Sequence, residues 1–194
     1  MKICVVNILL GLLMIVGESA ANIGYADLTT NVYFVATIKS STCQMSLEGG
    51  TAGGGDSYTI PVGSNGKVGA IDIINGTENA MANFSLDIIE CDDGISKINV
   101  TVSGTPSSTV STALKNNHDV NAGGAENVGL TIARQSAMDS PFVINSTLDS
   151  ERLVWTATEI SNKAVPLVAR LVKTSDKITA GDFSTIATFN FTYE

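Results

Sequence analysis

The chain is poor in charged side chains and in the residues that carry most metal and nucleophile chemistry. Charged residues make up 15% of its 194 residues, and it holds one His and three Cys, whereas soluble domains typically have about 25% charged residues. The net charge of −8 argues against binding to nucleic acid or to anionic lipid, because both need basic side chains. The composition therefore argues against an enzyme, and we expect no cofactor and no metal site.

Motifs of common catalytic and metal sites are missing as well. His118 lies in a polar, Asn-rich stretch and has no second His to complete a metal site. The Gly-rich stretch 49–56 lacks a following Lys-Ser/Thr and is expected to be a loop. One acidic cluster has a spacing that fits no EF-hand and is expected to be a solvated turn: Asp87, Glu90, Asp92 and Asp93.

The first 26 residues have the layout of a secretory signal peptide. Lys2 precedes an apolar run over 3–16, and small residues follow it. The run of about 14 residues is too short for a comfortable membrane span, and no other segment could span a bilayer. Cleavage after Ala21 or after Ala26 fits the small residues, and Ala26 is preferred for the reason given below.

Removal of the signal peptide simplifies the cysteine content. Cys4 leaves with the signal, and the exported chain keeps Cys43 and Cys91. A single pair in an oxidising compartment is most simply one disulfide.

The rest of the chain is a succession of short strands. Alternating apolar and small polar residues are separated by clusters of Gly, Asn, Asp and Ser. The pattern predicts strands at 32–38, 58–62, 81–89, 98–102, 128–133, 153–158, 165–172 and 183–193. Asp92-Asp93-Gly94 predicts a hairpin turn, and Pro166 predicts an edge position or a strand start. No window has a clear helical periodicity, so an all-β sandwich is expected.

Both ends of the exported chain are strands with an apolar face. The first strand carries on one face Thr30, Val32, Phe34, Ala36 and Ile38. The last strand carries on one face Ala187, Phe189, Phe191 and Tyr193. Because free chain ends normally fray, the aromatic residues of the last strand predict a place inside a sheet. Two such terminal strands favour binding in trans, in which a strand is added to a neighbour's sheet.

Five segments, in order, resemble the chaperone–usher pilins of the type 1 fimbrial kind. They are Ser41-Thr42-Cys43, Phe84-x-Leu86-x-Ile88-x-x-Cys91, Val128-Gly129-Leu130-Thr131-Ile132, Ala164-Val165-Pro166-Leu167-Val168-Ala169-Arg170-Leu171, and the ending Ala187-Thr188-Phe189-Asn190-Phe191-Thr192-Tyr193-Glu194. The resemblance covers essentially all of the chain after the signal peptide. One departure is Ala36, where the family usually has Gly.

This resemblance implies an incomplete immunoglobulin-like β-sandwich (the pilin fold), completed by a donor strand in trans. It divides the chain into a signal peptide (1–26), a donor-strand extension leading into the first strand (27–42) and a pilin domain (43–194). Cleavage after Ala26 leaves an extension of typical length for the family. The implied donor-strand residues are Thr30, Val32, Phe34, Ala36 and Ile38. The implied groove-edge strand, which a chaperone pairs with first, carries Phe189, Phe191, Tyr193 and Glu194.

The implied function is that of a structural subunit of a bacterial surface fimbria that is polymerised by donor-strand exchange and supports cell adhesion. The implied partners are a periplasmic pilus chaperone, an outer-membrane usher and neighbouring pilin subunits, in a homo- or hetero-polymer. The chain would then pass through the periplasm to the cell surface. Two alternatives stay open: a minor or tip-associated adhesive pilin, and a stand-alone secreted carbohydrate-binding β-sandwich.

Overall fold

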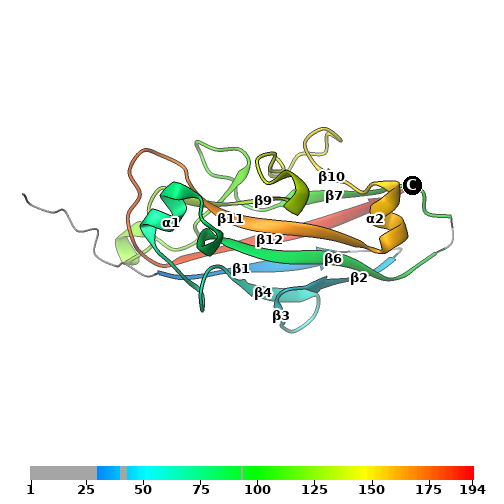
Figure 1. Cartoon of the computed structure of the whole chain (residues 1–194), viewed down its shortest axis with the longest axis horizontal. Helices are drawn as coiled ribbons and strands as arrows, with labels where there is room; N and C mark the ends of the chain where they lie inside the picture. Colours follow the sequence, from blue (N-terminus) through cyan, green and yellow to red (C-terminus); the bar gives the residue numbers. More distant parts are fainter. Residues whose placement is uncertain (1–29, 40–42, 93) are drawn as a thin grey trace, which may run out of the picture.

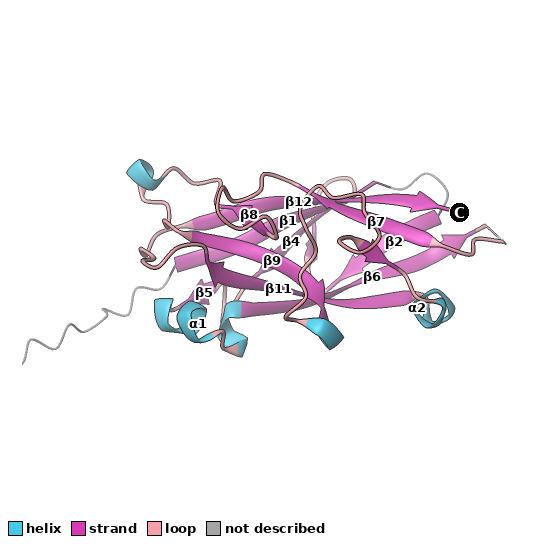
Figure 2. Cartoon of the chain, turned by 90° about the horizontal axis from the view of Figure 1, so that it is seen from above, coloured by secondary structure: helices cyan, strands magenta, loops and turns pink. Residues whose placement is uncertain are grey.

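The computed structural model describes residues 30–39, 43–92 and 94–194, which form two β-sheets packed face to face (Figures 1 and 2). The seven-stranded sheet has the order β10 (Leu153–Val154), β7 (Ile98–Ser103), β12 (Phe183–Tyr193), β1 (Thr30–Lys39), β4 (Ser57–Pro61) and β3 (Thr51–Ala52), with β5 (Lys67–Val68) beside β1. The five-stranded sheet has the order β2 (Cys43–Glu48), β6 (Met81–Cys91), β11 (Ala164–Lys173), β9 (Val128–Arg134) and β8 (Ala113–Lys115).

Helical segments are short and lie in the connections between strands. The two α-helices, α1 (Ala70–Asn75) and α2 (Ala157–Asn162), lie at opposite ends of the elongated molecule (Figure 1). The described residues also include three single 3₁₀ turns: Glu78–Ala80, Val120–Ala122 and Gln135–Ala137.

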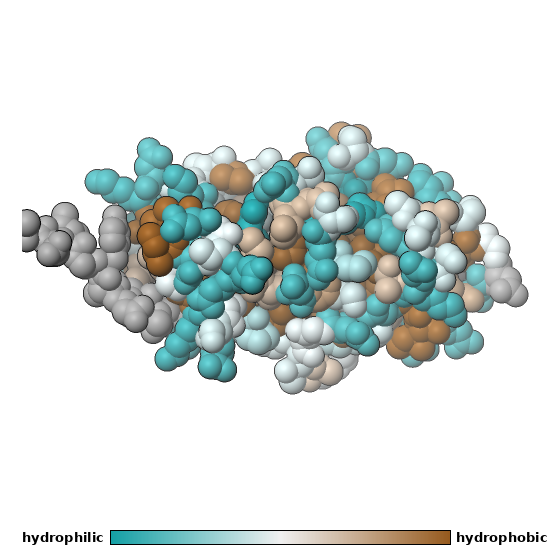
Figure 3. Space-filling view, in the orientation of Figure 1, coloured by the Kyte–Doolittle hydropathy of each residue, from teal (hydrophilic) through white to brown (hydrophobic). Residues whose placement is uncertain are grey.

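Alternation of apolar and polar residues along the strands produces the core between the two sheets. In β6, Phe84, Leu86 and Ile88 are buried while residues between them are more exposed, as expected when successive side chains point to opposite faces. Polar residues cover much of the face seen in Figure 3, where apolar residues form small, separate patches. The predicted all-β sandwich is confirmed.

The expected hairpin around Asp92-Asp93-Gly94 is wrong. β6 pairs with β2 and β11, whereas β7 pairs with β12 and β10 in the other sheet. The segment between β6 and β7 therefore crosses from one sheet to the other, and Asp93 itself lies outside the described residues. Turn composition identified the break between strands but could not identify their partners.

The strand predicted at 153–158 is wrong beyond its first two residues. β10 covers only Leu153–Val154, and α2 begins at Ala157. The hydroxyl of Thr156 accepts a hydrogen bond from the Glu159 amide (3.2 Å), and the Glu159 carboxylate accepts one from the Thr156 amide (2.7 Å). This reciprocal capping box satisfies amides at the start of the helix and favours it locally.

Glu159 also joins α2 to the end of β9. Its carboxylate accepts hydrogen bonds from Nε of Arg134 at 2.8 Å and from a terminal guanidinium nitrogen at 2.9 Å. Burial alone would raise the pKa of Glu159, but the hydrogen bonds from Arg134 and Thr156 hold that pKa below its ordinary value of 4.5. This pair links α2 to the five-stranded sheet, which contains neither of the two terminal strands.

Pro166 lies near the start of β11, which is the second of the two expected placements. β11 itself is central, between β6 and β9. Pairing with β9 begins only at Leu167, so Pro166 has a neighbouring strand on one side alone. An imino acid without an N–H is tolerated where the ladder is incomplete.

In the described ranges, no helix is long and apolar enough to cross a bilayer. The expected signal peptide (1–26) and its cleavage site lie outside the described residues.

Candidate functional site

The strand β1 lies between β12 and β4 (Figure 1), and we call the space that it fills between these two strands the groove. It runs parallel to β12 over eight paired residues, from Val32 opposite Phe183 to Lys39 opposite Asn190. On its other side it runs antiparallel to β4, from Tyr33 opposite Pro61 to Thr37 opposite Ser57. Both edges of β1 are therefore used in pairing, which gives its backbone the partners that an isolated strand lacks.

One face of β1 is completely withdrawn from solvent. Val32 and Ile38 are 1% and 3% exposed, and Phe34 and Ala36 are 0% exposed. On the opposite face, Tyr33 is 41% exposed. The groove thus receives an apolar stripe of four alternating side chains, and burial of each large one is worth about 1.5–3 kcal/mol.

The walls of the groove complement this stripe. The inward residues of β12 are Phe183, Thr185, Ala187, Phe189 and Phe191, all buried. Ile60 of β4, which pairs with Phe34, is 0% exposed. None of these inward residues is charged, and all but Thr185 are apolar. Apolar packing and the backbone hydrogen bonds of the two ladders therefore hold β1.

Phe84 of β6 reaches across from the opposite sheet. Its ring centroid lies 5.7 Å from that of Phe34 in an edge-on arrangement and 6.0 Å from that of Phe189. Aromatic pairs at such distances add to the area term. Phe84 therefore contributes to the floor of the groove.

Further backbone hydrogen bonds fix the position of β1 along the groove. The amide of Val32 donates to the carbonyl of Gly66 at 2.6 Å, and the amide of Val62 donates to the carbonyl of Val32 at 3.1 Å. At the other end, the amide of Ile38 donates to the carbonyl of Asp56 at 3.0 Å.

The single chain thus closes its own sandwich. The resemblance implied that a strand from another molecule completes the fold, whereas in this structure the completing strand is the chain's own β1. The stripe expected to act as donor, with Val32, Phe34, Ala36 and Ile38, is the stripe that fills the groove. Thr30 lies in the same strand, opposite Val68 of β5.

β12 borders the groove on one side and pairs with β7 on the other. Phe189 and Phe191 point into the core, with 0% and 8% exposure, and Tyr193 is partly buried against it. The rings of Phe191 and Tyr193 lie nearly parallel, 6.2 Å apart. The aromatic residues of the last strand therefore fix it in the sheet interior, as its pattern predicted.

Polar contacts fasten Glu194 at the end of β12. Its carbonyl oxygen accepts hydrogen bonds from the amides of Ser96 (2.9 Å) and Lys97 (3.1 Å), and its amide donates to the carbonyl of Lys97 (3.0 Å). Its carboxylate accepts from Nδ2 of the buried Asn99 at 3.0 Å and from Nζ of Lys97 at 3.3 Å. Hydrogen bonds to Asp149 and Glu194 raise the pKa of Lys97.

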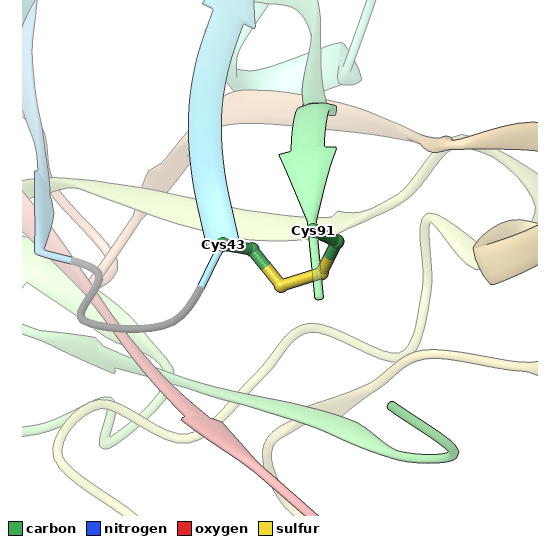
Figure 4. The surroundings of a disulfide bond; sticks show 2 residues. All are labelled: Cys43 and Cys91. Atoms are coloured by element: carbon green, nitrogen blue, oxygen red, sulfur yellow. A yellow bond between two sulfur atoms is a disulfide. The ribbon is translucent and has the colours of Figure 1, made fainter. Parts of the chain in front are cut away.

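A disulfide joins Cys43 at the start of β2 to Cys91 at the end of β6 (Figure 4). The two residues are register partners, with their Cα atoms 4.2 Å apart. The pairing expected from the cysteine content is present in the structure. Because Cys43 follows β1 by only a few residues, the bond fixes the point where the chain leaves the groove strand and enters the five-stranded sheet.

Two parts of the groove were not predicted from the sequence. Ile60 and Tyr58 of β4 form the wall opposite β12, and Phe84 crosses from the other sheet. The alternation at 58–62 predicted a strand, but periodicity carries no information on which strands pair. Phe84 was expected in a strand, with no assigned role in the groove.

Comparison with known proteins agrees with this architecture. The family model described as "Fimbrial protein" matches residues 32–194. The chain is also similar to the "Uncharacterized fimbrial-like protein YadM" of Escherichia coli (strain K12), with 29% identity over 168 residues that cover 84% of this chain and 86% of the relative. The matched region begins inside β1 and ends with the residue that anchors β12. The chain belongs to the fimbrial protein family.

Proposed function

We propose that this chain is a structural subunit of a bacterial surface fimbria and that β1 is the strand it passes to a neighbouring subunit. The proposal rests on one observation: the stripe of Val32, Phe34, Ala36 and Ile38 fits completely into a groove between β12 and β4. A segment that closes its own domain can make the same contacts in a second copy, because exchange of an identical element forms no new type of interface.

The head-to-tail geometry of such an exchange suits a fibre. Each subunit would give β1 to one neighbour and receive a strand from another, so the contact is heterologous and can extend without closing. Strand addition supplies main-chain hydrogen bonds for affinity, and alternate side chains supply specificity. The neighbouring subunits are therefore expected to be pilins with a similar groove.

An open groove needs protection before assembly. Without β1, the inward residues of β12 and β4 would form an exposed apolar surface beside two unpaired strand edges, which is an aggregation hazard. A periplasmic chaperone that pairs with β12 would cover this surface, and an outer-membrane usher would exchange the chaperone for the next subunit. The signal-like residues 1–26 would direct export, and the assembled fibre would support adhesion at the cell surface. The fimbrial family is generally non-enzymatic, in agreement with the expected structural role.

Phe34→Asp tests the proposal directly. The change places an unpaired carboxylate in an apolar pocket, and the cost of burying that charge should block docking. In cells that supply the cognate chaperone and usher, we expect the variant subunit to accumulate in complex with chaperone and to be absent from fibres. Tyr33→Asp is the matched control, because it puts the same charge on the exposed face of the same strand; fibres should still form.

The closed arrangement observed in the single chain favours one competing function, a stand-alone secreted sandwich that keeps β1 permanently. On that hypothesis Phe34→Asp would unfold the protein even with chaperone present, and its periplasmic level would fall. Degraded subunit would therefore contradict the proposal, whereas a stable chaperone complex without fibres supports it.

A further inference from the structure

A polar cavity of about 180 Å³ lies outside the groove, among connections at the end of the molecule opposite the C-terminus (Figure 1). Its lining comes from three connections and includes Ser107, Ser108 and Thr109 between β7 and β8, Glu126 and Asn127 before β9, and Thr174 after β11. None of its lining residues belongs to β1, β4 or β12. The cavity is therefore built independently of the strand that fills the groove.

The buried Asn116 fixes one wall of this cavity. Its Nδ2 donates hydrogen bonds to the carbonyl oxygens of Ala125 at 3.0 Å and Asp182 at 2.8 Å. Its Oδ1 accepts hydrogen bonds from the amides of His118 and Ser184, both at 3.1 Å. One side chain thus ties together three segments of the chain, and a site with walls fixed in this way is formed before a ligand arrives.

Hydrogen bonds also join the other two connections. The hydroxyl of Thr109 donates to the carbonyl of Thr174 at 2.8 Å, and the amide of Thr174 donates to the carbonyl of Asn127 at 2.8 Å. Nδ2 of Asn127 donates in turn to the carbonyl of Lys177 at 2.7 Å. These bonds use mostly backbone atoms, so several polar side chains of the lining stay available.

Lys115 and Glu126 bring opposite charges to the lining without being paired. Within the part of the chain that the structure describes, neither side chain takes part in an ion pair or a hydrogen bond. In another cavity, of about 270 Å³, the two lining arginines, Arg134 and Arg152, are each held by a carboxylate. The charges of that second cavity are satisfied within the protein, whereas those of the polar cavity are free to meet a ligand.

The free groups suit a neutral ligand whose own groups both donate and accept hydrogen bonds. An ammonium only donates, a carboxylate only accepts and a hydroxyl does both, and Lys115, Glu126 and Ser108 supply one of each. An ion of either sign would meet a group of its own charge. A sugar ring carries adjacent hydroxyls and no net charge, and its C–H groups can contact the apolar Val120, which is 48% exposed.

We propose that this cavity binds a single monosaccharide unit, with Glu126 accepting hydrogen bonds from its hydroxyls and Lys115 and Ser108 donating to them. One ring fits the volume, which is below the about 300–1,000 Å³ of sites for drug-sized ligands. The proposal goes beyond polymerisation through β1, since the single closed chain already contains the whole site.

NMR titration of the full mature chain tests the site and its ligand class. The probes are the methyl glycosides of glucose, galactose and mannose, with glycine as a zwitterion of opposite charges. We expect at least one glycoside to shift the ring resonances of His118, the single His of the chain, which lines the cavity. The indole resonance of Trp155, the single Trp, should not move, because Trp155 does not line it. No response to any glycoside, or a response of His118 to glycine alone, would overturn the proposal.

Charge-removing variants locate the binding groups. Glu126→Gln and Lys115→Met should each weaken binding by about tenfold, because hydrogen bonds to charged groups are the strong ones. Asp176→Asn and Lys177→Met are the matched controls, since they remove the same charges from exposed positions close by that do not line the cavity. Their affinity should stay within about twofold, as expected for screened surface charges. Equal losses in the variants and the controls would place the sugar elsewhere and overturn the assignment.

The same sugar unit can come from a diffusible saccharide or from the end of a glycan on a surface. Retention of the chain on albumin that carries the sugar, compared with unmodified albumin and with Glu126→Gln, indicates a surface glycan. Binding of the methyl glycoside without such retention indicates a diffusible saccharide. Because these experiments use the single chain, sugar binding can fail while fibres still form, and fibre formation can fail while the sugar binds.

Discussion

The two terminal strands, β1 and β12, are neighbours in one sheet but are held in different ways. β12 is flanked by β7 and β1, and its end is fastened by the hydrogen bonds of Glu194 to Ser96, Lys97 and Asn99. β1 is flanked by β12 and β4, and the buried side chains of its inward face, Val32, Phe34, Ala36 and Ile38, are all apolar. β12 is therefore bound as part of the scaffold, whereas β1 is bound as an insert in a groove that the scaffold forms.

The directions of the two strands add to this difference. β12 pairs antiparallel with β7, and β1 pairs parallel with β12. Parallel pairing is slightly less stable per residue than antiparallel pairing. β1 is antiparallel to β4 on its other side, so a strand entering in the reverse direction would pair antiparallel with β12 but parallel with β4. Both ladders and the apolar face are contacts that another strand of similar pattern can also make.

The comparison can be tested first by truncating one aromatic side chain in each strand. Phe34→Ala in β1 and Phe189→Ala in β12 should each lower the free energy of unfolding by about 3–5 kcal/mol, since both side chains are fully buried. Addition of the peptide of residues 30–39 should restore stability to the Phe34→Ala variant alone, because only its defect lies in the replaceable strand. Urea unfolding with and without peptide measures the stability of each variant. Rescue of both variants would contradict the distinction between a replaceable β1 and a fixed β12.

Loss of the disulfide should lower the free energy of unfolding by an amount comparable to, or slightly smaller than, that of the Phe→Ala changes. Replacing Cys43 and Cys91 together by Ser frees a chain segment with a sequence separation of 48 residues and should cost about 2–5 kcal/mol of stability. The defect lies in the scaffold, so added peptide should not repair it. Denaturant unfolding of the oxidised protein, the reduced protein and the double variant gives the comparison; equal midpoints for oxidised and reduced protein would contradict it.

Much of this arrangement could be predicted from the sequence, because the periodicity of a strand is a local property. Alternation of apolar and polar residues predicts the inward residues of β1, β6 and β12. The disulfide is predicted because only two Cys remain after the signal peptide. The partners of the strands could not be predicted, because pairing depends on contacts between residues distant in sequence. The segment between β6 and β7, for example, is a crossover between the two sheets and not the hairpin that its turn residues indicate. The helix α2 was missed although Thr156 and Glu159 have the spacing of a capping box, since six residues are too few for a periodic signal.

The state of the groove could not be predicted either. The same stripe of apolar residues suits insertion in cis and in trans, so alternation alone does not distinguish a closed chain from an exchanged one. The packing of Phe84 against Phe34 and Phe189 brings together three strands from two sheets, and no local pattern reports it.

The contact between Glu159 of α2 and Arg134 of β9 involves neither terminal strand, and its loss should lower the free energy of unfolding by a smaller, pH-dependent amount. Arg134 holds the pKa of Glu159 below the ordinary value of 4.5. The carboxylate thus stabilises the fold above the unfolded-state pKa, and this contribution is lost as the pH falls through the lower pKa of the folded state. Glu159→Gln should cost about 1–2 kcal/mol at pH 7 and flatten the dependence of stability on pH below about 4.5. A variant with an unchanged acid profile would contradict this assignment, and the peptide should not rescue it.

The smallest expected effect concerns the end of β12. Glu194→Ala removes the acceptor of the Asn99 amide, and Asn99 is 1% exposed with an Oδ1 atom that already lacks a partner. We expect a loss of about 1 kcal/mol, the usual value of one hydrogen bond. Hydrogen exchange should rise at the last residues of β12 and at Ser96–Lys97 but not along β1, whose ladder with β12 ends at Asn190. Increased exchange along the whole of β1 would mean that the two strands open together, and β1 would then be part of the scaffold and not a replaceable insert.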